Sequence, residues 1–212
     1  MAWRKRRSVV KNLAEGLLKV GALQFGTFTL PDGKMSPYYI NLGGLPSYPG
    51  VYSLVVDAVS ELASKKAPKA DALCGVPLTG LTIAAPVAVA LNKPLVYTRL
   101  SKKPSGRGVE GEVRPDWNVA VVDDLTTSGN AVLSAAEAVE EEGGEVTHAL
   151  VLIDRLEGAR ERLSRKGIAL HAVTDMMEVA DNLHAMDLIT EENLKSITRS
   201  AGTSKRQPRA RK

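Results

Sequence analysis

Residues 120–129 read AVVDDLTTSG, where an apolar run meets two adjacent carboxylates, a leucine, three hydroxyl residues and a glycine. The apolar stretch at 118–124 is typical of a buried strand, and a helical pattern follows at 129–142. In a parallel sheet the carboxyl ends of the strands face the ligand crevice, so Asp123 and Asp124 are expected at its rim. The segment therefore predicts an α/β fold with a ligand site at the end of this strand.

The rest of the chain repeats this alternation of apolar runs and helical segments. Such a pattern predicts a mostly parallel sheet with helices on both faces. The five expected strands are 72–76, 94–99, 118–124, 147–154 and 168–174, with helices between them at 79–91, 129–142 and 159–166. Only 4% of the residues are aromatic, so aliphatic side chains must form the core.

Composition narrows the class of protein. Of the 212 residues, 44% are hydrophobic and 25% charged, as in one ordinary globular domain, which we expect over residues 1–202. The lone cysteine, Cys74, rules out an intramolecular disulfide and a cysteine-based zinc site, which favours a reducing compartment. No apolar run approaches the about 18 residues of a membrane span, and no signal peptide is evident. We therefore expect a soluble, cytoplasmic protein.

The two ends of the chain are basic. Residues 1–11 and 203–212 each contain five Lys or Arg residues and no acidic residue, although the whole chain has a net charge of only +4. The body between them is therefore acidic. Basic ends of this kind either contact nucleic acid or are solvated and frayed, and the second case is commoner. We expect 203–212 to be a disordered tail and do not expect a nucleic-acid partner.

The polar loop after the acidic pair has the composition of an anion site. Free backbone N–H groups of Thr126 to Gly129, at the start of a helix, form an anion-binding nest, and the three hydroxyl side chains add donors. The two carboxylates repel the same anion, but they suit sugar hydroxyls or a metal. The acidic pair and the polar loop after it together predict a site for a phosphorylated ribose.

A plain helix start is the alternative interpretation of this segment. In that case a Ser or Thr caps the helix and an acid interacts favourably with the helix dipole. Capping accounts for one acid, but it leaves the second carboxylate and the run of three hydroxyl residues without a reason. We therefore favour the ligand site.

Residues 120–129 resemble the phosphoribosyl pyrophosphate signature of the type I phosphoribosyltransferases. Four further segments resemble the orotate-specific members of that family, and the similarity covers about residues 17–183. These segments are FGTFTLPDGKMSPYYINLGG (25–44), GVPLTGLTIAA (75–85), TRLSKKPSGRGVEG (98–111) and LIDRLEGAR (152–160). The resemblance implies a type I fold in which a small hood at about 8–50 covers a core at about 51–175, with closing helices at about 176–200.

The resemblance also implies which residues bind substrate. The acidic pair would hold the ribose hydroxyls, the loop after it the 5′-phosphate, and Thr79 the pyrophosphate, although residues 75–80 also read as a plain strand-to-helix turn. Tyr39 and Arg155 would contact the base, Arg155 through the orotate carboxylate. The implied substrate-binding residues are Tyr39, Thr79, Arg99, Lys102, Lys103, Asp123, Asp124, Leu125, Thr126, Thr127, Ser128, Gly129 and Arg155.

A basic loop is expected to complete the site. In the family such a loop closes over the pyrophosphate, commonly from the neighbouring subunit. The resemblance therefore implies a homodimer with shared sites, and it assigns catalysis to Arg99 and Lys103 together with Asp124. Residues 101–111 are rich in glycine and charge, as expected of a mobile loop or of a merely solvated one.

Simpler interpretations stay open for the two base contacts. Tyr39 is also typical of a half-buried strand aromatic, and Arg155 has Asp154 beside it in sequence as a partner for a local ion pair. Three positions depart from the family pattern, namely Pro31, Leu100 and Ser105. Lys34 and Lys102 are the nearby cations that would have to compensate for lost contacts to pyrophosphate.

The implied reaction is displacement of pyrophosphate from phosphoribosyl pyrophosphate by a ring nitrogen of orotate. The product would be orotidine 5′-monophosphate, in de novo pyrimidine (UMP) biosynthesis. The charge of pyrophosphate requires Mg²⁺, held mainly through the substrate, and cationic side chains. Two alternatives stay open: a phosphoribosyltransferase for another base, and a non-catalytic regulator that binds phosphoribosyl pyrophosphate.

Overall fold

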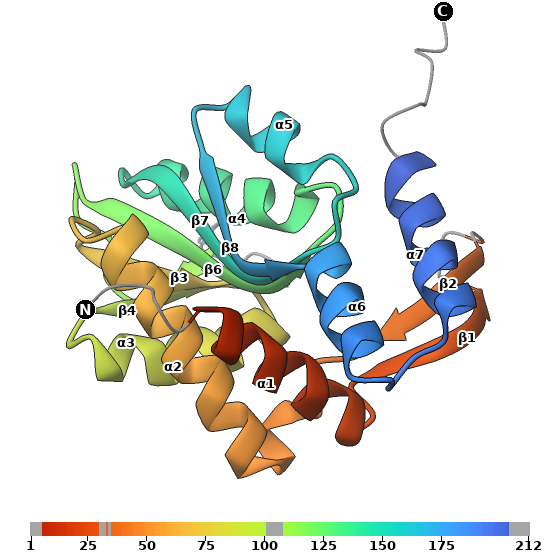
Figure 1. The fold of residues 1–212 in the computed structure, drawn as a ribbon. Helices are drawn as coiled ribbons and strands as arrows, with labels where there is room; N and C mark the ends of the chain where they lie inside the picture. Colours follow the sequence, from red (N-terminus) through yellow and green to blue (C-terminus); the bar gives the residue numbers. More distant parts are fainter. Residues whose placement is uncertain (1–5, 30–32, 34, 101–107, 204–212) are drawn as a thin grey trace, which may run out of the picture.

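A six-stranded sheet forms the centre of the protein (Figure 1). The computed structural model describes residues 6–29, 33, 35–100 and 108–203. The strands are β3 (Ala72–Gly75), β4 (Leu95–Thr98), β5 (Val109–Glu110), β6 (Asn118–Thr126), β7 (Glu145–Asp154) and β8 (Ala169–Asp175). Their order is β5-β4-β3-β6-β7-β8, with β5 antiparallel to β4 and all other neighbours parallel.

The sequence predicts five strands, and the sheet has six. The additional strand, β5, lies within 98–111, which the sequence predicts as a loop. It pairs Val109 with Thr98 and Glu110 with Tyr97. A strand of two residues shows no alternation of apolar and polar positions, so the sequence pattern could not reveal it.

Helices cover both faces of this sheet (Figure 1). They are α1 (Arg6–Lys19), α2 (Pro49–Lys66), α3 (Thr79–Ala90), α4 (Asn130–Glu141), α5 (Ala159–Ser164), α6 (Met176–Ala185) and α7 (Glu191–Thr203), with a short 3-10 helix, η2 (Leu45–Ser47). Among the helices of the described residues, none combines the length and the apolar character that crossing a bilayer requires.

Consecutive residues of the central strand β6 face two separate cores. Ala120 and Val122 pack in the core that contains α1, α2 and α3, whereas Val119 and Val121 pack with α4 and α5. All four side chains are fully buried. Because both faces are covered, the strand stays apolar until Asp123, and its acidic residues lie at the carboxyl end, the edge at which open α/β sheets bind ligands.

A two-stranded antiparallel hairpin lies outside the main sheet. It consists of β1 (Leu23–Thr29) and β2 (Met35–Ile40). Helix α7 packs against β2, and α6 packs against both α1 and α7. Figure 1 shows the hairpin and α7 together at one side of the sheet. The expected tail at 203–212 lies, apart from Thr203, outside the described residues.

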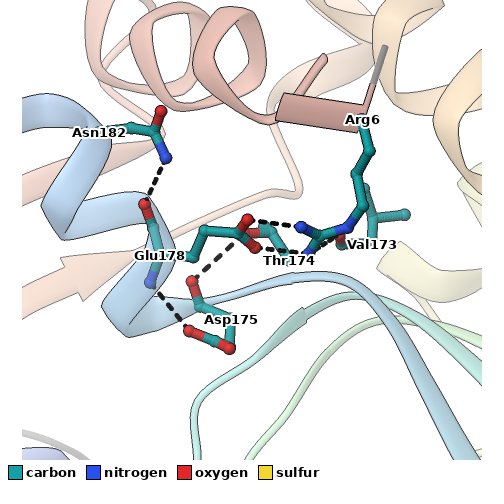
Figure 2. Close-up of polar contacts among 6 residues, drawn as sticks. All are labelled: Arg6, Val173, Thr174, Asp175, Glu178 and Asn182. Atoms are coloured by element: carbon teal, nitrogen blue, oxygen red, sulfur yellow. Dashed lines mark hydrogen bonds and ion pairs between the residues drawn. The ribbon is translucent and has the colours of Figure 1, made fainter. Parts of the chain in front are cut away.

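Arg6 joins the start of α1 to α6 (Figure 2). Its two terminal nitrogens donate to the two carboxylate oxygens of Glu178, and Nη2 also donates to the Val173 carbonyl oxygen at 3.0 Å. Thr174 Oγ1 donates to the same carboxylate at 3.0 Å, and Asp175 caps α6 by accepting from Glu178 N at 2.8 Å. The prediction of a solvated basic end is therefore wrong for Arg6, because a bidentate ion pair fixes it.

Two histidines that are far apart in sequence meet on neighbouring strands. His148 Nδ1 on β7 lies 3.2 Å from His171 Nε2 on β8. Burial, together with the positive charges of His148, Lys66 and Arg160, lowers the pKa of His171 from 6.5 to about 4. The unfolded chain therefore takes up this proton near pH 6.5, and the folded protein takes it up only near pH 4.

This difference predicts a loss of stability in acid. We expect the free energy of unfolding to decrease as the pH falls from about 7 toward 4, because the unfolded state binds the His171 proton first. The contribution is about 1 kcal/mol, since solvent screens a partly exposed ring. Urea unfolding at several pH values measures it, and His171→Asn should flatten the dependence in this window. The same slope in both proteins would contradict the assignment.

Candidate active site

Asp123 and Asp124 form an acidic pair at the carboxyl end of β6. Asp123 is 6% exposed, and its Oδ1 atom accepts a hydrogen bond from Asp124 N at 2.9 Å. Burial raises the pKa of both carboxyls, and the negative charge of Asp124 raises the pKa of Asp123 further. Within the part of the chain that the structure describes, neither carboxylate has a Lys or Arg partner. Both therefore have lone pairs available for hydrogen-bond donors of a ligand.

The first turn of α3, which follows β3, lies directly against this pair. A Cβ atom added to Gly80 would lie 2.7 Å from Asp123 Oδ1 and 2.9 Å from Asp123 Cα. Nearby, Val76 N donates to Val122 O at 3.0 Å. Only glycine at position 80 allows α3 to come this close to Asp123. Thr79 precedes Gly80 at the start of α3, so the predicted pyrophosphate loop and the acidic pair share one edge of the sheet.

The segment after the acidic pair turns sharply into α4. Gly129 caps this helix with φ +82°, and no side chain makes a capping hydrogen bond, so the interpretation as a Ser or Thr cap is wrong. Among the described residues, no protein acceptor receives a hydrogen bond from the N–H groups of Thr127, Ser128 or Gly129. These groups are therefore available to an anion.

The two residues before these N–H groups have a structural role in the strand. Leu125 packs against the main core, and Thr126 ends β6 as a buried residue. The Thr126 side chain is thus less accessible to a ligand than those of Thr127 and Ser128, which are partly exposed. Residues 123–129, which the sequence predicts as one site, lie together in the structure. Within this segment, Thr127 to Gly129 are the best placed to contact a phosphate.

Arg155 follows β7 and lies beside Tyr38 of the hairpin. Arg155 Nε donates to the Tyr38 hydroxyl oxygen at 3.2 Å, and its guanidinium carbon lies 4.9 Å from the centre of the Tyr38 ring. Tyr38 is buried, which raises the pKa of its phenol. The predicted base contact, Tyr39, lies on the other face of β2, is 40% exposed and packs against Phe28. The structure thus brings Tyr38, which the sequence reasoning missed, to Arg155.

The ion-pair partner of Arg155 is Glu157. Arg155 Nη2 lies 2.9 Å from Glu157 Oε1. Asp154, the partner in the alternative interpretation, accepts instead from Leu156 N at 2.8 Å and from Arg160 Nη2 at 3.3 Å. Asp154 and Arg160 both line a cavity of about 1010 Å³ beside α5. Arg155 does form a local ion pair, as the alternative interpretation states, but its partner is Glu157 and not Asp154.

The described residues contain only part of the predicted basic loop. Arg99 Nη1 lies 2.6 Å from Glu110 Oε1, and Arg99 N donates to the Gly108 carbonyl oxygen at 2.9 Å, so residues 99 and 108 are adjacent. Leu100 is exposed. Several positions singled out from the sequence lie outside the described residues: Pro31, Lys34, Lys102, Lys103 and Ser105.

The acidic pair is suited to Mg²⁺ only as part of a larger ligand set. Among the described residues, no group of three or more His, Cys, Asp or Glu side chains is arranged to hold a metal ion. Carboxylate oxygens are the hard donors that Mg²⁺ accepts, but Asp123 and Asp124 fill only part of its octahedral shell. The remaining ligands would have to be oxygen atoms of a substrate or water.

An acidic pair beside a loop whose N–H groups have no acceptor in the described chain, at the carboxyl edge of a mostly parallel sheet, is the arrangement expected of an α/β enzyme for phosphorylated sugars. The phosphoribosyl transferase domain family matches residues 49–168, which contain both features. The orotate phosphoribosyltransferase of Cenarchaeum symbiosum (strain A) is 39% identical over 184 residues, which are 84% of this chain and 90% of that protein. That of Sulfolobus acidocaldarius is 38% identical over 190 residues, which are 88% and 94%.

Solved structures agree with these relatives. The orotate phosphoribosyltransferase of Aeropyrum pernix matches with a TM-score of 0.72 and 37% identity, over 81% of this chain and 99% of that one. The UMP synthase of Leishmania donovani matches with a TM-score of 0.84 and 30% identity over 93% of this chain, which spans 43% of that protein. The chain therefore belongs to the orotate phosphoribosyltransferases. The predicted family, the α/β fold and the class of enzyme, a pentosyltransferase, are confirmed.

Proposed function

We propose that the protein converts orotate and 5-phosphoribosyl 1-pyrophosphate to orotidine 5′-monophosphate and pyrophosphate, a step of de novo pyrimidine (UMP) biosynthesis. One observation carries the proposal: a buried acidic pair and a loop whose N–H groups have no acceptor in the described chain lie together at one end of β6. The match to orotate phosphoribosyltransferases includes this segment and supports orotate as the base.

The sugar is held from two directions. Asp123 and Asp124 accept hydrogen bonds from the 2′- and 3′-hydroxyls of the ribose, and the N–H groups of Thr127 to Gly129 donate to the 5′-phosphate. The bond from C1′ to the pyrophosphate oxygen breaks and its electron pair leaves with that oxygen, while a ring nitrogen of orotate forms the new bond to C1′ and releases its proton to solvent. No covalent enzyme intermediate is required, so alignment and the exclusion of water supply much of the rate.

The leaving pyrophosphate requires positive charge around it. In this proposal residues 75–80, including Thr79, contact the pyrophosphate through the backbone, and Arg99, Lys102 and Lys103 stabilise its charge as it departs. Mg²⁺ bound to the substrate oxygens supplies further charge stabilisation.

A second copy of the chain and a cytoplasmic location belong to the same proposal. A homodimer would let the basic loop of one copy reach the site of the other. The single cysteine, Cys74, is a buried free thiol, as expected in a reducing compartment.

The base is recognised at the other end of the site. Arg155 donates to the carboxylate of orotate, because a planar guanidinium matches a planar carboxylate with two parallel hydrogen bonds. The Tyr38 hydroxyl, which accepts a hydrogen bond from Arg155 Nε at 3.2 Å, holds the guanidinium in place.

The loss of orotate absorbance in the presence of phosphoribosyl pyrophosphate and Mg²⁺ tests the proposal. We expect orotate to be consumed with release of one pyrophosphate per molecule, and uracil and purine bases to be used at least about 100-fold less well. A preference for another base would reassign the substrate. Binding of both substrates without turnover would support a non-catalytic regulator instead.

A further inference from the structure

Arg155 is held on two sides by protein groups. Nε donates to the Tyr38 hydroxyl, Nη2 lies 2.9 Å from Glu157 Oε1, and the guanidinium lies over the Tyr38 ring. The Arg155 side chain is only 11% exposed. Among the described residues, no acceptor receives a hydrogen bond from Nη1. The guanidinium is therefore fixed at Nε and Nη2, while Nη1 and the second N–H of Nη2 are left for a ligand.

A tight turn places Glu157 on Arg155. Leu156 has φ +62° and Gly158 φ +96°, and Asp154 Oδ1 accepts from Leu156 N at 2.8 Å. A leucine rarely adopts a left-handed conformation, so the surrounding contacts must hold it there. The turn folds Glu157 back onto the residue two positions before it.

Arg155 is also anchored to the sugar side of the site. Arg155 N donates to the Thr126 carbonyl oxygen at 3.0 Å, at the point where β6 passes into the phosphate loop. The backbone of Arg155 is thus fixed relative to the phosphate loop, and its side chain is fixed by Tyr38 and Glu157. A rotation of the guanidinium changes the direction in which its donors meet the base. It does not move the residues that bind the ribose.

We infer that Glu157 is a positioning residue that acts through Arg155 and sets the preference for an anionic base over a neutral one. The inference rests on the proposed function, in which Arg155 receives the orotate carboxylate. With Glu157 in place, the free edge of the guanidinium offers two parallel donors, as a planar carboxylate requires. Without it, a nearly buried cation loses its charge partner and can rotate, so the edge no longer faces the carboxylate.

Steady-state kinetics of Glu157→Ala test this role. We expect the KM for orotate to rise about tenfold, with kcat and the KM for phosphoribosyl pyrophosphate changed less than about twofold. The kcat/KM for uracil, which has no carboxylate, should stay unchanged, so the preference for orotate falls. Glu157→Gln keeps an acceptor oxygen at the same distance and should restore most of the preference. Glu161→Ala removes an exposed acid of α5 and should behave as the parent protein does.

A double-mutant cycle separates this inference from the proposed function. Glu157→Ala should have no further effect on the KM for orotate once Arg155 is replaced by Ala, because Glu157 acts only through that side chain. If Arg155→Ala raises the KM and Glu157→Ala leaves or lowers it, Glu157 is no positioning residue and the proposed function stands. If Arg155→Ala itself leaves the KM for orotate unchanged, the carboxylate contact and the role of Glu157 are both overturned.

Discussion

Replacing Asp123 with Asn should lower the transferase rate by at least about 100-fold and, at the same time, make the folded protein more stable at pH 7. Both effects come from the loss of one negative charge. The rate falls because a neutral amide accepts weaker hydrogen bonds from the ribose hydroxyls and presents a donor where one acceptor stood. The stability rises because a buried carboxylate without a cationic partner is costly to ionise in the folded state.

The pH dependence follows from the direction of the pKa shift. Burial, and then the charge of Asp124, raises the pKa of Asp123 in the folded protein above its ordinary value of 3.8. The folded protein therefore keeps a proton that the unfolded chain has already lost. The stabilising contribution is complete below the unfolded pKa and is lost as the pH rises through the folded pKa. Asn has no such proton, so the advantage of the variant should grow from about pH 4 to pH 7.

Urea unfolding at several pH values measures the stability, and orotate consumption measures the rate. Asp71→Asn is a suitable control, because Asp71 is an exposed acid at the opposite end of the sheet, where its Oδ2 accepts from Asn118 N at 2.9 Å. The control should keep the parent rate and gain no stability. A fully active Asp123→Asn protein would remove the ribose role, and reduced stability at pH 7 would contradict the argument from burial.

The second large effect is expected from Gly80→Ala, which should destabilise the fold by roughly 1–3 kcal/mol and remove most of the activity. Helix propensity alone predicts the opposite sign, because Ala is preferred to Gly in a helix by about 1 kcal/mol. At Gly80 the steric contact of the added Cβ outweighs helix propensity, so the substitution is expected to destabilise the protein. The added Cβ would lie 2.9 Å from Val122 O and from Asp123 Cα, which are backbone atoms and cannot rotate away.

Gly50→Ala is the matched control for this substitution. Gly50 is the second residue of α2, as Gly80 is of α3, and nothing lies within 4 Å of a Cβ added to Gly50. The Gly50→Ala protein should keep full activity, and its free energy of unfolding should increase by up to about 1 kcal/mol. Chemical denaturation and the orotate assay compare the two proteins. If Gly80→Ala matches Gly50→Ala in both measurements, the close contact between α3 and the acidic pair is unimportant.

The sheet and the ribose-phosphate segment could be predicted from the sequence for the same reason. Strand β6 is apolar on both faces because each face has its own core, so the strand and the polar residues at its end are visible as a pattern. The acidic pair and the phosphate loop are consecutive in the chain, and one strand-loop-helix unit positions them. Their proximity needs no knowledge of long-range packing.

The base end of the site could not be predicted in this way. Tyr38 and Arg155 are 117 positions apart, and the choice between two adjacent tyrosines depends on the register of β2, which sets Phe25 opposite Tyr38. Both tyrosines fit a strand equally well. The contact of Glu157 with Arg155 depends on a left-handed leucine, for which the residue type gives no signal.

The packing of α1 on α6 and of β2 on α7 has a consequence for synthesis of the chain. Each of these early segments has other native contacts, but neither meets its C-terminal partner helix until residues 176–203 have left the ribosome. Contacts between such distant parts of a polypeptide form slowly, because the intervening chain must first be brought together. The docking of α7 on the hairpin that contains Tyr38 therefore cannot be completed before the chain has been synthesised to about residue 203.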